Sequence, residues 1–175
     1  MLIKTEDLLP KKIINFYLPQ ELKLLDKSVV LSKPAASKKG MVHNLMQVDG
    51  ITKILLTGKL LSVYYDTDNK DDLRMLVLAE LDDYLTADLS PIDDITNVSD
   101  IEWVETLSDA FIRPTLNRDK GDIEIISFID GILKIKFMGH CAGCPYAQNT
   151  LQNVIAKTLL NYMPRIKEIS LEDNK

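Results

Sequence analysis

A stretch without hydrophobic periodicity, residues 86–99, divides this 175-residue chain into two parts. Acidic and turn-forming residues replace the regular apolar spacing found on either side, which is typical of a linker. A chain of this length allows either one large or two small globular domains. We therefore expect one domain over residues 1–86, a linker over 87–99 and a second domain over 100–175.

The first part carries the pattern of a β-hairpin with a helix packed on it. Strand-like runs at 51–57 and 60–65 flank Gly58 and Lys59, which predicts a two-residue turn. Apolar residues then recur at helical spacing, at Leu73, Leu76, Val77, Leu81 and Tyr84. We expect a third strand at 13–18 and a short helix at 39–47. His43 lies in that helix and is expected to be an ordinary surface or core residue without a chemical role.

The second part begins with a predicted helix. Ser99 and Glu102 fit a capping box, in which each side chain satisfies a free backbone N–H at the helix start. The apolar stripe that follows consists of Ile101, Val104, Leu107, Ala110 and Phe111. Because proline lacks a backbone N–H, Pro114 should kink or end this helix.

A predicted hairpin, a second helix and a last strand follow. Strand-like runs at 123–129 and 132–137 are separated by Asp130 and Gly131, a strong signal for a tight turn. The second helix carries Ala147, Leu151, Val154, Ile155, Leu159 and Tyr162 on one face and stops before Pro164. With a strand at 166–171, the C-terminal domain becomes helix–strand–strand–helix–strand. The fold class is α+β, with two small domains.

Composition and charge narrow the class of function. The apolar fraction (46%) and the charged fraction (27%) are ordinary for soluble globular proteins. The formal net charge is −5 and no long basic stripe occurs, so nucleic acid is not an expected partner. Neither a membrane span nor a secretory signal is expected. We expect a bacterial-type cytoplasm, or the mitochondrial matrix if the chain is a processed organellar protein.

The chemistry of the chain concentrates in its two cysteines, Cys141 and Cys144. Two thiols this close in a reducing compartment indicate metal or redox chemistry. If Pro145 takes the first helical position, Cys144 lies near the helix N-cap, where a thiol loses its proton more readily. Gly139 and Gly143 permit a tight backbone path beside the sulfurs. His140 is expected to be an exposed bystander.

Several interpretations of this C-x-x-C pair remain open. A thioredoxin-like pair would need further strands after its helix, and only 31 residues follow Cys144. A structural zinc site or an iron–sulfur cluster normally takes four protein ligands, whereas one chain offers two thiolates. Either metal centre therefore implies a symmetric dimer. The cysteines could also be inert turn residues.

A family pattern extends beyond the cysteines. The matching segments are IRPT at 112–115, DKGD at 119–122, DGI at 130–132, GHCAGCP at 139–145 and YMP at 162–164. From residue 103 to 169 the chain resembles the C-terminal domain of NifU-like (Nfu) iron–sulfur scaffolds. Lys120 stands where the family's acidic turn usually carries the first of two glycines. The first part resembles the N-terminal domain often found before this module, most clearly at LMQVDGI, 45–51.

This resemblance implies a carrier and not an enzyme, with no catalytic residues. Cys141 and Cys144 would bind a labile cluster, 4Fe-4S more readily than 2Fe-2S, bridged between two chains in a homodimer. The partners would be apo iron–sulfur client proteins and the cluster assembly machinery. The alternative is a thioredoxin-like dithiol oxidoreductase.

Overall fold

The computed structural model describes residues 3–9, 11–19, 28–33, 40–88 and 96–172. The chain forms two compact units, Met1–Val98 and Ser99–Lys175. Both contain helices and strands, so the predicted α+β class is confirmed. No helix within the described ranges is both long enough and apolar enough to cross a membrane.

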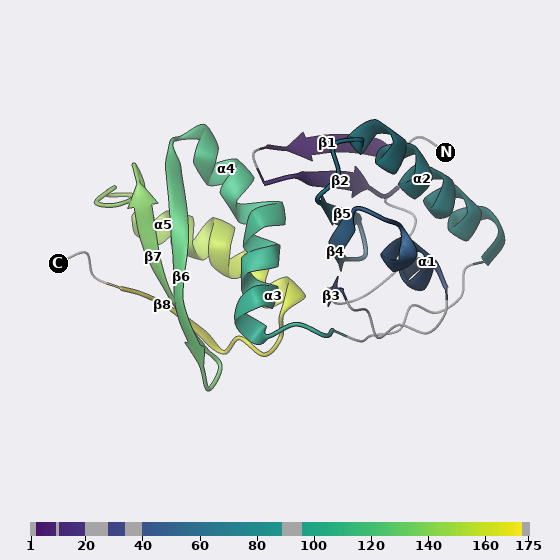
Figure 1. The fold of residues 1–175 in the computed structure, drawn as a ribbon. Coiled ribbons are helices and arrows are strands. Elements are labelled where there is room, and N and C mark those ends of the chain that lie inside the picture. Colours follow the sequence, from purple (N-terminus) through teal and green to yellow (C-terminus); the bar gives the residue numbers. More distant parts are fainter. Residues whose placement is uncertain (1–2, 10, 20–27, 34–39, 89–95, 173–175) are drawn as a thin grey trace. The chain divides into compact units, whose positions relative to one another are not determined.

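The first unit contains an antiparallel five-stranded sheet with the strand order β1-β2-β5-β4-β3 (Figure 1). Its strands are β1 (Lys4–Leu8), β2 (Ile13–Tyr17), β3 (Val29–Ser32), β4 (Ile51–Leu56) and β5 (Leu60–Tyr65). Its helices are α1 (Met41–Gln47) and α2 (Lys70–Asp83), and α2 continues as the π-helical turn η1 (Tyr84–Asp88). Lys39, the first residue of the predicted short helix, lies outside the described ranges.

The predicted β4–β5 hairpin is present, and its turn is closed as expected. The N–H of Thr57 donates to the Leu60 carbonyl at 2.8 Å, which leaves Gly58 and Lys59 as the two turn residues. The Thr57 hydroxyl oxygen also accepts from the N–H groups of Lys59 (3.2 Å) and Leu60 (3.0 Å). A side chain thus satisfies two turn donors that the strand ladder cannot reach.

Two strands of this sheet carry no clear sequence signal. The edge strand β1 has the sequence KTEDL, which is too polar to suggest a strand. The other edge strand, β3, is a run of only four residues, VVLS. Edge strands pair on one side only, and short or charged sequences are common there.

Helix α2 packs on the sheet through a narrower stripe than the spacing predicts. Leu73, Val77, Leu81 and Tyr84 belong to the hydrophobic core, together with residues of α1 and of alternate sheet positions. Leu76, assigned to the same stripe, is 55% exposed. At about 100° per residue, Leu76 points roughly 100° away from the centre of the buried stripe.

A charged cluster fastens β1 to α2. Asp7 accepts from Lys70 Nζ at 2.8 Å and from Arg74 Nη2 at 2.8 and 3.1 Å. The hydrogen bond from Lys70, with the charge of Arg74, lowers the pKa of the Asp7 carboxyl despite its partial burial. Since β1 lies at the sheet edge, these contacts supplement its pairing with β2.

The described ends of the predicted linker are ordered. The π-helical turn reaches Asp88, and Asn97 attaches to the edge strand β3. The side chain of Asn97 accepts from the Ser32 N–H at 2.9 Å and donates to the Ser32 carbonyl at 2.8 Å. Residues 89–95 of the predicted linker lie outside the described ranges, so its bounds stay a prediction.

The second unit contains a three-stranded sheet, β6-β7-β8, with helices packed on one side of it (Figure 1). Its strands are β6 (Gly121–Ile129), β7 (Ile132–Gly139) and β8 (Glu168–Leu171). The first helical segment comprises α3 (Asp100–Leu107), the π-helical turn η2 (Ser108–Ile112) and α4 (Arg113–Arg118). The second comprises α5 (Ala147–Thr150), the π-helical turn η3 (Leu151–Ala156) and α6 (Lys157–Tyr162). The predicted order helix–strand–strand–helix–strand is confirmed.

The start of α3 follows the sequence prediction, but the helical segment does not end at Pro114. The Ser99 hydroxyl accepts from the Glu102 N–H at 3.2 Å, as a helix cap requires. Pro114 neither ends the segment nor needs a hydrogen bond there, because it occupies the first turn of α4 after η2. Ile101 is 45% exposed, whereas Trp103 is only 7% exposed and fills the core position.

The β6–β7 hairpin turns at Asp130 and Gly131, with φ of 54° and 88°. Both values lie in the left-handed region, as a type I′ turn requires. Ile125 pairs with Ile135 and Ser127 pairs with Lys134, so Ile126 is an extra residue in β6 and forms a bulge. Strand β8 then runs parallel to β7. Parallel pairing needs a crossover, which the helical segment 147–162 supplies.

Candidate functional site

The two cysteines lie in the turn that leaves the end of β7. The Cys141 N–H donates to the Met138 carbonyl at 3.2 Å, and the Ala142 N–H donates to the Gly139 carbonyl at 3.1 Å. The Cys144 N–H reaches the Cys141 carbonyl at 3.4 Å. Consecutive turn hydrogen bonds thus fold the backbone tightly between the two thiols.

The helix after this turn begins later than the sequence predicts. Its first residue is Ala147, and the Thr150 N–H donates to the Tyr146 carbonyl at 3.0 Å. Pro145 is therefore still in the turn, and Cys144 is not next to the helix cap. A residue before proline is disfavoured in helical conformation, so the chain passes Cys144 without helical structure. The predicted effect of a helix N-terminus on the thiols does not apply.

The predicted tight backbone path is present. Gly139 and Gly143 have φ of 59° and 80°, values that favour glycine. A Cβ on Gly139 would lie 2.4 Å from the carbonyl oxygen of Lys120, so no larger residue fits there. That carbonyl accepts from the His140 N–H at 3.1 Å.

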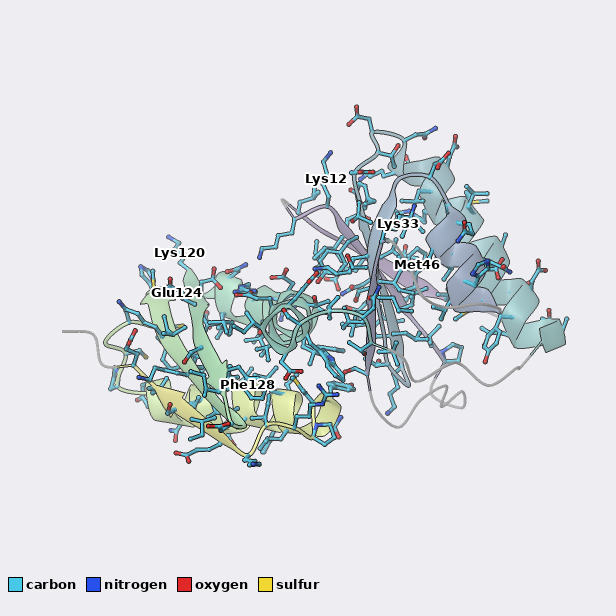
Figure 2. The ribbon with its side chains drawn as sticks, turned by 60° about the horizontal axis from the view of Figure 1, so that its bottom comes forward. Lys12, Lys33, Met46, Lys120, Glu124 and Phe128 are labelled. Atoms are coloured by element: carbon cyan, nitrogen blue, oxygen red, sulfur yellow. The ribbon has the colours of Figure 1, made fainter. Side chains whose placement is uncertain are left out.

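Lys120 keeps a glycine-like backbone although it is not glycine. Its φ is 57°, in the left-handed region where a side chain costs roughly 1 kcal/mol. Figure 2 shows Lys120 at the same end of β6 as Glu124, with Phe128 further along the strand. The acidic turn before β6 therefore has, at Lys120, the left-handed backbone conformation that favours glycine.

Both thiols are free and half-buried. Burial raises the pKa of the Cys141 thiol, and the nearby Cys144, Asp119 and Asp122 raise it further. A hydrogen bond from the backbone N–H of Asp122 opposes this rise without cancelling it. Cys141 is consequently a weaker acid than an ordinary thiol. A bound metal centre would reverse this, because a coordinating thiol is deprotonated outright.

The two cysteines line one pocket of about 380 Å³. Its wall also includes Asp119, His140, Tyr146 and Thr150. His140 is exposed, as predicted, but it does face this pocket. Within the part of the chain that the structure describes, no group of three or more His, Cys, Asp or Glu side chains could hold a metal ion.

The sequence predicts the two thiols as site residues but not the residues that surround them in the pocket. Asp119 precedes the strand β6 and Thr150 follows the turn, and only the folded chain brings them together. The signal for Asp119 was the acidic run DKGD at 119–122, whereas nothing in the local sequence marks Tyr146. His43 is half-buried on α1 in the first unit and takes no part in this pocket.

Comparison with known proteins connects this pocket to a named domain. A family model described as "NifU-like domain" matches residues 104–170. The protein named NFU1 iron-sulfur cluster scaffold homolog, mitochondrial, of Drosophila willistoni is 26% identical over 171 residues, 86% of this chain and 59% of that protein. The Homo sapiens protein of the same name is 24% identical over 181 residues, 97% of this chain and 71% of that protein.

The chain spans about three fifths of the length of the first Drosophila relatives that it matches. A solved structure, protein SAV1430 from Staphylococcus aureus, is 18% identical with a TM-score of 0.39. The match covers 46% of this chain and 99% of that one.

Proposed function

Because the chain belongs to the NifU-like (Nfu) family, we propose that it carries iron–sulfur clusters on Cys141 and Cys144 and delivers them to apo-proteins. The observation that carries this proposal is the placement of two half-buried, free thiols in one turn that lines one pocket. A cluster held there stays within reach of solvent and of an acceptor protein. Such access suits transfer better than permanent storage.

Ligand counting supports a cluster shared between two chains. A cluster usually takes four cysteine thiolates, and this chain has two cysteines. His140 and Asp119 line the same pocket, yet they form no metal-binding group with the thiols in the described residues. We propose a homodimer that bridges one cluster, 4Fe-4S in preference to 2Fe-2S. The proposed role is that of a scaffold and carrier, without catalytic turnover.

The partners and the compartment follow from the same proposal. The clients would be apo iron–sulfur proteins, and the donors would be components of the cluster assembly machinery. The relatives' names include the word mitochondrial. We therefore favour the mitochondrial matrix over the bacterial-type cytoplasm. The first unit would serve as a docking module for partners or as a module that positions the cluster site.

The raised pKa of Cys141 argues against the dithiol oxidoreductase alternative. Disulfide exchange needs an attacking thiolate, and burial keeps Cys141 protonated more than an ordinary thiol. The described part of the second unit also follows its second helical segment with the single strand β8. Repeated, rapid reduction of a protein disulfide by the apo protein would favour the oxidoreductase instead.

Anaerobic reconstitution with iron and sulfide tests the proposal. Absorption and Mössbauer spectra should show a cluster, and light scattering should show a dimer with one cluster per two chains. The Cys141→Ala, Cys144→Ala double variant is the matched control and should stay colourless. Mixing it with wild-type chains should give no stable cluster-bearing heterodimer. A colourless wild-type product would reject the carrier function, and a monomer with a full cluster would reject the bridge.

A further inference from the structure

Gly121, the first residue of β6, lies directly against the sulfur of Cys141. A Cβ on Gly121 would lie 2.1 Å from the Cys141 Sγ and 3.2 Å from the Cys141 Cβ. The φ of Gly121 is outside the left-handed region, so the backbone itself does not demand glycine. Glycine is required here because the sulfur occupies the space that a Cβ would need.

The next residue, Asp122, is held in place through its carboxylate. Its Oδ1 accepts from Arg113 Nε at 3.1 Å and from the Ile123 N–H at 2.8 Å. Two hydrogen bonds to Oδ1 therefore fix the residue that follows Gly121.

Arg113 connects this contact to the interior of the unit. Its side chain is only 9% exposed and bonds Asp109 at 2.6 Å and Glu105 at 2.7 Å. It also donates to the Ile123 carbonyl at 3.1 Å. The start of β6 is thereby anchored to the first helical segment of the unit.

We propose that Gly121 and Asp122, anchored by Arg113, form a seat that fixes the Cys141 sulfur for cluster binding. Gly121 provides the space and Asp122 fixes the backbone beside it, so both are positioning residues and not ligands. The proposal rests on the proposed carrier function for its purpose. Its physical content, a sulfur held against the first residues of β6, exists in the apo protein and can be tested there.

Gly121→Ala tests the seat directly, because the added methyl group takes the place of the sulfur. We expect the ratio of Cys141 to Cys144 alkylation by iodoacetamide, measured by mass spectrometry on the folded apo protein, to rise several-fold as the thiol is displaced toward solvent. Glu124→Ala, on an exposed position of the same strand, is the control and should leave the ratio at the wild-type value. A wild-type ratio in Gly121→Ala would overturn the proposal.

A double-mutant cycle keeps the test valid if Gly121→Ala unfolds the domain. In a Cys141→Ala background the sulfur is gone, and the Cβ contact at 3.2 Å is the nearest that remains. Gly121→Ala should therefore cost clearly less stability in that background than in the wild type. Equal costs in the two backgrounds would refute a seat for the sulfur.

Cluster loading separates this inference from the proposed function. In reconstituted protein, Gly121→Ala should shorten the cluster's lifetime against a chelator several-fold, whereas Glu124→Ala should not. If wild-type protein takes up no cluster, the carrier function is rejected. The alkylation ratio and the double-mutant cycle then still test whether Gly121 positions the Cys141 sulfur. If the wild type loads and Gly121→Ala retains its cluster equally long, the seat fails and the carrier function stands.

Discussion

The buried Arg113 offers the most quantitative test of how the cysteine turn is supported. We consider Arg113→Met, which keeps an unbranched side chain of similar length and removes the charge. Burial by itself would lower the pKa of Arg113, but hydrogen bonds and charges from Glu105 and Asp109 outweigh burial and raise it. The guanidinium therefore stays charged inside the unit, held by these acids and by Asp122.

The cost of removing this charge follows from the exposure of its partners. The Asp109 side chain is 11% exposed, and breaking a buried pair costs about 3–5 kcal/mol. The side chains of Glu105 and Asp122 are 36% and 47% exposed, so water can solvate them once Arg113 is gone. Losing each of these ion pairs should cost no more than about 1 kcal/mol of stability. We take the lower end of the buried-pair range, about 3 kcal/mol. A unit the size of Ser99–Lys175 is stable by only about 4–11 kcal/mol.

Urea unfolding followed by tryptophan fluorescence measures this cost. Trp103 is the single tryptophan of the chain and is buried in α3, so its emission reports on the second unit. With a slope of about 1 kcal/mol per molar urea, a cost of about 3 kcal/mol should lower the midpoint by roughly 3 M. Arg118→Met, at the exposed end of the same helix, should change stability by less than about 0.5 kcal/mol. If Arg113→Met moved the midpoint no further than Arg118→Met, the buried network would not support this unit.

Cys141→Ala and Cys144→Ala should each abolish cluster retention on gel filtration while shifting apo stability by less than about 1 kcal/mol, because both residues are half-buried in a turn. Iron loading should speed up from pH 7 to 9, since binding must displace the proton that the raised pKa of Cys141 retains; a pH-independent rate would contradict this. The lowered pKa of Asp7 stabilises the first unit above about pH 4, and this contribution disappears as the pH falls through the folded-state value. Asp7→Asn should therefore lower the urea midpoint, followed by circular dichroism, at pH 7 but not near pH 2.

The sequence predicted the second unit well because its signals are local. Asp130 and Gly131 specify the hairpin turn through their own backbone preferences, and Ser99 specifies a helix start through one hydrogen bond. The strands that the sequence did not reveal, β1 and β3, depend on their neighbours for pairing. Nothing within KTEDL indicates a strand until β2 lies beside it.

The candidate site likewise has features that the local sequence predicts and features that only the folded chain creates. The spacing of Cys141 and Cys144 marks the thiols, and the glycines around them mark the turn. The contact of Gly121 with the Cys141 sulfur could not be predicted from the local sequence. It depends on the pairing of Gly121 with Gly139, which brings the start of β6 next to the turn after β7. The assignment of Cys144 to a helix cap was wrong because Pro145 remains in the turn and the helix begins at Ala147.

The bulge in β6 affects how this gene can change length. Ile126 is the extra residue of the ladder, so deleting its codon would leave Ile125 and Ser127 opposite the partners that they already have. A one-codon deletion between Leu133 and Phe137 would instead reverse the inward and outward positions of β7 on one side of the gap. It would also pull the cysteine turn out of register with Gly121. Length variation among descendants of this chain should therefore be tolerated at residue 126 and rejected in β7.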